Sequence, residues 1–400
     1  MRMRHILLLV MLSVVLGHSR TAASADIARG EYLVKVGNCA GCHTARGGAD
    51  FAGGRAIQSP FGTFRTPNIT PHDETGIGEW NRDEFWQALH NGERPDGAPI
   101  YPACPYPNYT RVRRRDVDAI FAYLRSVPAV DRVNQDHELD FPASVRAFVN
   151  VWQGLFFEPG TLAPQRDRGE LWNRGAYLVK GLGHCSACHR ARGALGARRM
   201  DDPTTGGRIH GWYAPSLHSR AEAGLQGWRV EDAAAFIRSG IFEDARMNGP
   251  MADVVFDSLQ YLSGRDARAI AVYLTNLPDH DARSAAQLLA VREHRRRTMR
   301  GQGRAIYEEH CAECHASDGE GSVAAPALVG NRAVTLADPK NLVNVIRHGA
   351  YPASTDGNPR PFGMPPFYQL SRQELAAVIT YIRTSWGNDA SPVSTANVAW

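Results

Sequence analysis

The sequence has no strong charge of either sign. Its 400 residues contain 45 Lys plus Arg and 41 Asp plus Glu, a formal net charge of +4 at pH 7. Nucleic-acid-binding proteins usually carry a larger basic excess, so this balance does not favour a nucleic-acid partner. Hydrophobic residues make up 43% and charged residues 22%. These ordinary fractions exclude a disordered or collagen-like chain and predict a folded protein of roughly two to four domains.

Long apolar runs are also scarce. Residues 6–16 form an apolar run of eleven, whereas a helix needs about 20 residues to cross a bilayer core. No later segment is both long and uncharged enough, so we expect no membrane span. Arg2 and Arg4 precede the run and Ala23-Ser24-Ala25 follows it, as in a secretory signal peptide. We therefore predict a signal peptide at residues 1–25 and a periplasmic location.

Cysteine is sparse and follows one pattern. Six of the seven cysteines fall in three Cys-x-x-Cys-His strings, at residues 39–43, 185–189 and 311–315, which leaves Cys104 over. This arrangement does not indicate a disulfide framework. A Gly-x-Gly-x-x-Gly fingerprint after a plausible strand is also lacking, so we expect no flavin or nicotinamide site in this chain.

The segments around the strings form an internal repeat. Residues 29–35 (RGEYLVK) and 174–180 (RGAYLVK) lead into the first two strings, and 303–307 (GRAIY) leads into the third. Each string is followed by a segment with apolar residues at helical spacing, and Tyr123, Tyr273 and Tyr381 are in register there. The repeat predicts an all-α chain of three tandem domains, at residues 26–165, 166–295 and 296–400.

Each string has the geometry that covalent haem attachment requires. Cysteines at i and i+3 and a histidine at i+4 share one helix face. The two thiols can add to the vinyl groups along one haem edge, and the histidine then lies under the iron. A structural zinc site would need a second ligand pair, which no repeat offers, and a thioredoxin-like redox pair would need a βαβ context. We therefore predict three covalently bound haem c groups, attached at Cys39 and Cys42, Cys185 and Cys188, and Cys311 and Cys314, with His43, His189 and His315 as axial ligands.

A haem that carries electrons usually has a sixth iron ligand, commonly Met. The first repeat contains no Met. Met251 lies 62 residues past His189, Met364 lies 49 past His315, and the residue 61 past His43 is Cys104. This spacing predicts Cys104, Met251 and Met364 as the distal ligands of the three haems.

Alternatives to these ligands remain open. Met247 is a rival to Met251, and Met200 is expected in a loop. Cys104 could instead be a buried thiol, with His72, His90 or, less favourably placed, His137 on the iron. Pro67, Pro215 and Pro326 recur between haem string and distal ligand. We expect their carbonyl groups to accept a hydrogen bond from the axial histidines.

These residues carry a family resemblance. The segments 152–157, 172–189 and 249–255 resemble the three-haem cytochrome c subunit of bacterial membrane-associated periplasmic dehydrogenases. The resemblance implies three class I cytochrome c domains and electron transfer from a catalytic dehydrogenase subunit, of molybdenum, quinoprotein or flavoprotein type, that acts on alcohols, aldehydes, sugars or N-heteroaromatics. It also implies transfer toward a quinone or a terminal oxidase, and peripheral association with the outer face of the inner membrane. The 156–160 join and the short C-terminus look more like the molybdenum-linked members.

A self-contained haem enzyme is the alternative class. A multihaem peroxidase needs an open iron position, yet each repeat offers a sixth ligand. A sulfur-compound oxidising cytochrome with a Cys-ligated haem fits Cys104, but no other residue supports it. We therefore predict a non-catalytic electron-transfer subunit.

Overall fold

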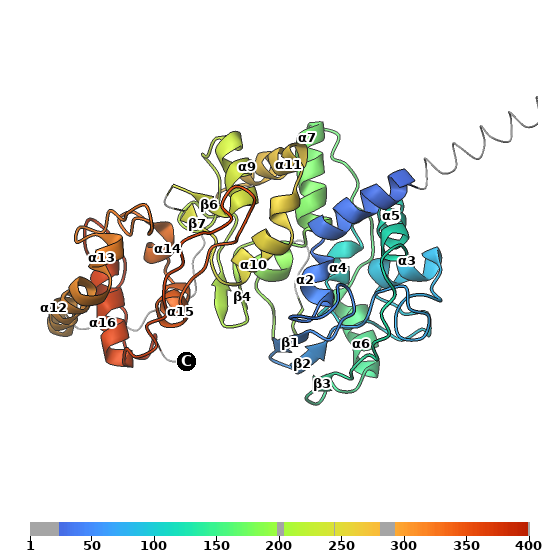
Figure 1. Cartoon of the computed structure of the whole chain (residues 1–400), viewed down its shortest axis with the longest axis horizontal. Coiled ribbons are helices and arrows are strands. Elements are labelled where there is room, and N and C mark those ends of the chain that lie inside the picture. Colours follow the sequence, from blue (N-terminus) through green and yellow to red (C-terminus); the bar gives the residue numbers. More distant parts are fainter. Residues whose placement is uncertain (1–23, 198–203, 244, 281–292, 399–400) are drawn as a thin grey trace, which may run out of the picture. The chain divides into compact units, whose positions relative to one another are not determined.

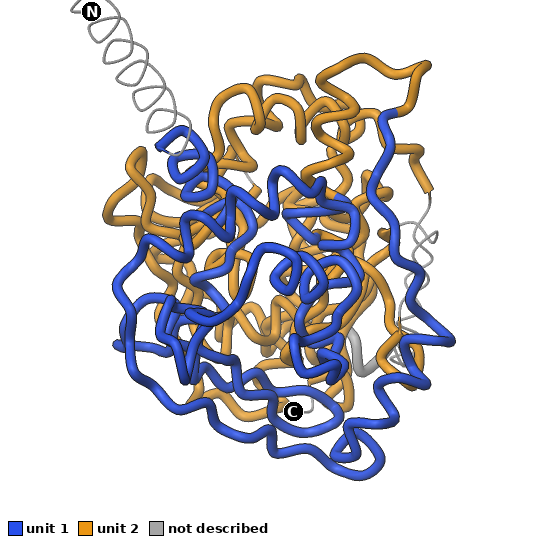
Figure 2. Tube along the Cα trace, turned by 90° about the vertical axis from the view of Figure 1, so that its right-hand side faces the viewer, with its two compact units in different colours: residues 1–164, 180–184 blue, residues 165–179, 185–400 orange. Residues whose placement is uncertain are grey.

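The computed structural model describes residues 24–197, 204–243, 245–280 and 293–398 (Figure 1). The predicted signal peptide, except for its last two residues, and Met200 lie outside the described residues. The chain divides into two compact units, Met1–Pro164 with Lys180–His184, and Gln165–Val179 with Cys185–Trp400 (Figure 2). The first unit holds one Cys-x-x-Cys-His string and the second holds two. No helix within the described ranges is long and apolar enough to cross a membrane.

The first unit is mostly helical. A helix covers residues 24–36 and leads into the short helix α2 (Cys39–His43), which carries the first string. Strands β1 (Ala56–Ser59), β2 (Gly62–Arg65) and β3 (Glu138–Leu139) form an antiparallel sheet with β2 in the middle. The remaining helices are α3 (Arg82–His90), α4 (Tyr106–Tyr109), α5 (Arg114–Leu124) and α6 (Ala147–Phe156).

The second unit repeats this plan around two strings. The part with the second string contains α7 (Glu170–Tyr177), the π-helical turn Leu178–Leu182, α8 (Ser186–His189), β4 (Gly207–Ile209), β5 (Trp212–Ala214), α9 (Val230–Ser239), β6 (Ile241–Phe242), β7 (Ala245–Arg246), α10 (Pro250–Asp257), the 3₁₀ turn Leu259–Tyr261 and α11 (Gly264–Thr275). The part with the third string contains α12 (Glu293–His310), α13 (Ala312–His315), α14 (Arg332–Thr335), α15 (Lys340–His348) and α16 (Arg372–Arg383). The predominantly helical class is as predicted, but the small antiparallel sheets were not.

A glycine marks the same helix crossing in each repeat. A Cβ atom added to Gly30, Gly175 or Gly303 would lie 2.0, 2.0 or 2.1 Å from the carbonyl oxygen of Ala119, Ala269 or Ala377. The helix before each string therefore touches the closing helix through backbone atoms, which only glycine allows. Tyr123, Tyr273 and Tyr381 lie at the three crossings, which confirms that they are in register.

An ion pair beside the crossing was not anticipated from the sequence. Arg29 Nη2 lies 2.6 Å from Asp116 Oδ1, and Arg174 Nη2 lies 2.6 Å from Asp266 Oδ2. Both carboxylates are buried, so each arginine compensates a charge that has lost its water. At the matching place in the third repeat, Glu374 instead accepts a hydrogen bond from the backbone of Ser371 and caps its own helix.

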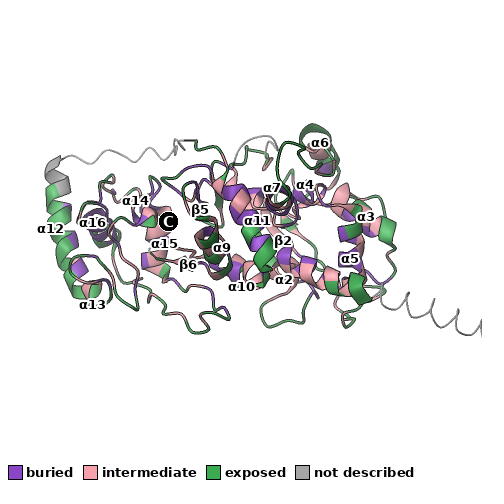
Figure 3. Cartoon of the chain, turned by 90° about the horizontal axis from the view of Figure 1, so that it is seen from above, coloured by how far each residue is buried: buried purple, intermediate pink, exposed green. Residues whose placement is uncertain are grey.

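Helix α6 has an apolar face that is open to solvent in the described structure. Its inner side packs through Val149 against Phe64 and Tyr101. Phe148, Val151 and Leu155 lie on the exposed side, between 46% and 67% exposed (Figure 3). We call these three residues the α6 face.

Candidate haem sites

The histidine of every string makes the same hydrogen bond. The Nδ1 atoms of His43, His189 and His315 lie 2.8, 2.7 and 3.0 Å from the carbonyl oxygens of Pro67, Pro215 and Pro326. Because a carbonyl only accepts, Nδ1 must donate, which leaves the Nε2 lone pair to bind a metal. Burial lowers the pKa of all three imidazoles and favours the neutral ring. The proline carbonyls are therefore confirmed as the expected partners, and each ring is arranged for axial ligation through Nε2.

A short hairpin delivers two of these carbonyls. Strand β2 ends at Arg65, two residues before Pro67, and β5 ends at Ala214, directly before Pro215. The prolines are evident in the sequence, whereas these hairpins are not. The third carbonyl, that of Pro326, lies in a loop in which Ser322 Oγ accepts from the backbone of Ala324 and Ala325.

The paired thiols lie close to each other and are not joined by disulfide bonds. None of the seven cysteines forms a disulfide. Burial, and then the charge of the partner thiol, raises the pKa of Cys39 and of Cys185 to about 12 and that of Cys311 to about 11. Among the residues that the structure describes, no group of three or more His, Cys, Asp or Glu could hold a metal ion, so the zinc alternative gains no support. Two thiols and an imidazole whose Nε2 can accept a metal are a donor set that fits covalent haem c.

Cys104 lies beside the first thiol pair. Burial is the main cause that raises the pKa of Cys104 to about 12, and the charge of Cys42 is the next. Since such an interaction acts only at short range, the fold brings Cys104 to the string some 60 residues before it, as the spacing predicted. Tyr109 shares this pocket: its pKa is raised by burial and by the charges of Cys39, Cys104 and Cys42. The Tyr109 hydroxyl donates to the Gly37 carbonyl at 3.2 Å, and no periodicity in the sequence had indicated this residue.

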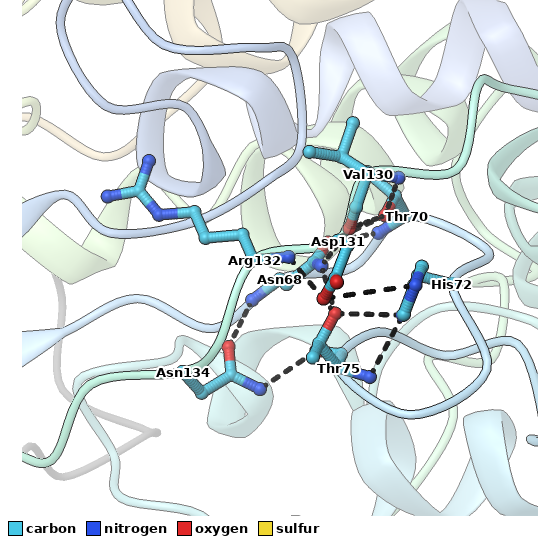
Figure 4. A network of polar contacts seen from close by, with 8 residues as sticks. All are labelled: Asn68, Thr70, His72, Thr75, Val130, Asp131, Arg132 and Asn134. Atoms are coloured by element: carbon cyan, nitrogen blue, oxygen red, sulfur yellow. Dashed lines mark hydrogen bonds and ion pairs between the residues drawn. The ribbon is translucent and has the colours of Figure 1, made fainter.

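The three histidines that compete with Cys104 are held by partners of their own. His72 Nδ1 lies 3.0 Å from Thr75 Oγ1, and its Nε2 lies 3.8 Å from the Asp131 carboxylate (Figure 4). His90 stacks on Trp86 with ring centroids 4.3 Å apart. His137 Nδ1 lies 3.1 Å from the backbone nitrogen of Arg65, whose N–H it accepts.

The two methionine candidates lie in different local settings. Met364 pairs through its backbone with Ala350 in both directions, at 2.7 and 3.0 Å, and packs against the same hydrophobic core as Cys311. Met251 is the second residue of α10. Met247 donates its N–H to the Gly240 carbonyl at 2.8 Å and is half-buried, as Met251 is. The preference for Met251 over Met247 stays a prediction.

Comparison with known proteins agrees with this donor set. The sequence model of the cytochrome c family matches residues 27–128 and 301–386. The chain is 37% identical to the cytochrome c subunit of quinone alcohol dehydrogenase from Gluconacetobacter polyoxogenes, over 95% of this chain and 85% of that protein. It is 35% identical to the gluconate 2-dehydrogenase cytochrome c subunit of Pantoea cypripedii, over 96% and 92%. It is also 34% identical to a nicotinate dehydrogenase subunit of Pseudomonas putida, over 92% of this chain and 31% of that protein.

Proposed function

The chain belongs to the cytochrome c family, and from that premise we propose that it is a periplasmic three-haem subunit that transfers electrons from a catalytic dehydrogenase subunit toward the respiratory chain. The observation that carries this proposal is the bond from each string histidine to a proline carbonyl, which recurs three times at 2.7 to 3.0 Å. A repeated bond of this kind is what an axial imidazole requires. Membership of a family with covalently attached haem supports the group itself.

The chain's own residues would hold and tune three such groups. A bound haem c supplies a reversible one-electron couple between ferric and ferrous iron. The six string cysteines anchor it, and the carbonyls of Pro67, Pro215 and Pro326 fix the tautomer and orientation of the axial imidazoles. The neutral thioethers of Met251 and Met364 are weak donors that favour ferrous iron. We assign the outgoing end of the electron path to the second and third sites for this reason.

We propose that Cys104 is the distal ligand of the first site. Its electrostatic interaction with Cys42 supports this assignment. A thiolate bound to iron is an anionic donor and stabilises the ferric state, so this site should have the lowest potential of the three. It then accepts electrons only from a strongly reducing partner, or it stays oxidised while the other two sites carry the current.

We also propose three tandem class I cytochrome c domains, with the boundaries predicted from the sequence. The recurrent crossings at Gly30, Gly175 and Gly303 support this organisation, since each repeat closes its own first and last helix by the same backbone contact. The two-unit division leaves the boundary between the second and third domains as a proposal.

The partner follows from the relatives. The curated relatives are named as cytochrome c subunits of alcohol and gluconate dehydrogenases and as a nicotinate dehydrogenase subunit. We propose a catalytic partner of quinoprotein, flavoprotein or molybdenum type that oxidises an alcohol, an aldehyde, a sugar or an N-heteroaromatic compound. The acceptor would be a quinone or a terminal oxidase, reached from the outer face of the inner membrane.

The test is to count haems and then remove the partner. The chain, expressed with a cytochrome c maturation system, should give three haems in an alkaline pyridine haemochrome assay, and a Cys185→Ala/Cys188→Ala variant should give two. Clearly fewer than three in the wild type would contradict the proposal. Substrate should reduce these haems only when the co-purifying dehydrogenase is present. Turnover by the single chain would instead support the self-contained enzyme.

A further inference from the structure

The outer edge of β5 is occupied by a side chain from the part of the second unit that carries the third string. Asn341, in α15, accepts the Tyr213 N–H through Oδ1 at 2.9 Å. Its Nδ2 donates to the Tyr213 carbonyl oxygen at 2.7 Å. One amide thus satisfies both backbone groups of Tyr213, as a neighbouring strand would.

Two further contacts fix the same hairpin to the same region. Asn344 Nδ2 donates to the Gly211 carbonyl, in the turn between β4 and β5, at 3.0 Å. Arg208, in β4, forms an ion pair with the buried Asp338 carboxylate, which also accepts the Lys340 N–H at the start of α15. The hairpin is therefore held at both strands and at its turn.

The held strand leads directly to the axial histidine of the second site. Pro215 follows β5, and its carbonyl is the one that accepts from His189. On the far side of Pro215, the Ser216 N–H donates to Glu222 Oε2 at 2.6 Å, and Tyr213 Oη donates to the same oxygen at 2.8 Å. Pro215 is thus fixed between Glu222 and the Asn341-bound Tyr213.

The first unit solves the same problem with its own residues. Arg65 stands two residues before Pro67, as Tyr213 stands two before Pro215. The Arg65 N–H donates to His137 Nδ1, and β3 pairs along the same strand, β2. The second site has no such third strand in the described sheet of β4 and β5, and Asn341 stands in its place.

We propose that Asn341 is a positioning residue for the axial imidazole of His189. By fixing β5 it fixes the Pro215 carbonyl, so the redox potential at the second site depends on a residue from the repeat that carries the third. This inference rests on the proposed function, because it requires a haem at Cys185 and Cys188. A firm Nδ1–H bond makes the imidazole a stronger donor and favours ferric iron. Weakening that bond should raise the potential of this haem.

The test compares Asn341→Leu, Asn341→Asp and a control, Asn276→Leu. Leucine has a branched shape similar to that of asparagine without a donor or acceptor, and aspartate keeps the acceptor for the Tyr213 N–H but loses the donor. Asn276 Nδ2 donates to the Val272 carbonyl at 2.8 Å at the exposed end of α11, so its loss removes one asparagine-to-backbone bond away from the hairpin. The readouts are spectroelectrochemical potentials, electron paramagnetic resonance of the ferric protein, and hydrogen exchange at the Tyr213 amide. The signal of the second haem is the one missing in Cys185→Ala/Cys188→Ala.

We expect faster exchange at Tyr213 and a positive shift of the second potential alone in Asn341→Leu, a smaller shift in Asn341→Asp, and none in Asn276→Leu. If Asn341→Leu does not fold, Asn341→Asp carries the test. Faster exchange with an unchanged second potential and an unchanged resonance signal would overturn the inference. A wild-type protein without haem at Cys185 and Cys188 would instead refute the proposed function, so the two failures are distinguishable.

Discussion

Gly30→Ala is expected to destabilise the first unit, although alanine is the better helix former. The new Cβ would lie 2.0 Å from the Ala119 carbonyl oxygen and 2.8 Å from Tyr123 Cβ. Ordinary contacts of a Cβ atom begin at 3.4 Å, so the two helices would have to separate by about 1.4 Å. Because the obstructing oxygen belongs to the backbone, no rotamer change relieves the clash. Overpacking of this kind costs ~1–3 kcal/mol and occasionally more, and the separation also loosens the packing around it.

Helix propensity acts in the opposite direction but is smaller. Replacing a helix-interior glycine by alanine gains ~0.5–1 kcal/mol where there is space. Gly154, in α6 of the same unit, has no heavy atom within 4 Å of its added Cβ, so Gly154→Ala isolates this gain. We expect Gly30→Ala to lose roughly 2 kcal/mol and Gly154→Ala to gain up to about 1 kcal/mol.

Native-state hydrogen exchange of the haem-loaded chain measures both effects locally. Amides in residues 24–36 and in α5 should lose protection in Gly30→Ala, because they open together when the crossing weakens. Global melting is less suited, since a chain with several separate cores does not unfold in one step. Equal or greater protection in Gly30→Ala, as in Gly154→Ala, would show that the helices do not touch through their backbones. Gly175→Ala and Gly303→Ala should repeat the loss in their own repeats.

Two further predictions concern protonation and iron ligation. Burial first, and then Arg146, lowers the pKa of His137, with Arg94 acting in the same direction and Asp136 against it. Since the folded pKa lies below the unfolded value of about 6.5, the first unit should keep its full stability above that pH and lose stability as the pH falls below it, where a charged ring can no longer accept the Arg65 N–H. Exchange protection of β2 at pH 7.5 and 5.5 measures this, and His137→Phe should remove the pH dependence; an equal dependence in that variant would refute the assignment. Replacing the distal ligands should shift one potential each: Cys104→Met upward, and Met251→Ala and Met364→Ala downward. Redox titration checks this, and any residue whose replacement moves no potential is not a ligand.

The parts that the sequence could predict are those that repeat. The helices around the strings follow a 3.6-residue period over nine or more positions, and the recurrence of Pro67, Pro215 and Pro326 was enough to identify the partner of each axial histidine. Strands β4 and β5 have three residues each, which is too short for a two-residue alternation to stand out. The all-α prediction therefore omitted them.

The pairing of Asn341 with Tyr213 was beyond reach for a different reason. The two residues are 128 positions apart, and the contact joins parts of two repeats rather than recurring within each. The Arg29–Asp116 pair recurs only in the first two repeats, and its residues are charged types that usually lie on solvated surfaces. In both cases the tertiary fold, and no local pattern, determines the partner.

The α6 face determines how the isolated chain must be handled. Phe148, Val151 and Leu155 present a surface without charge to the solvent, and such a surface promotes contact between copies as concentration rises. Helix α6 also touches the loop of Cys104, because Gln153 Nε2 lies 3.2 Å from Tyr106 Oη. Light scattering should therefore accompany every potentiometric measurement. A potential recorded for the first site belongs to one defined species only in dilute solution, or in a mild detergent that covers this helix.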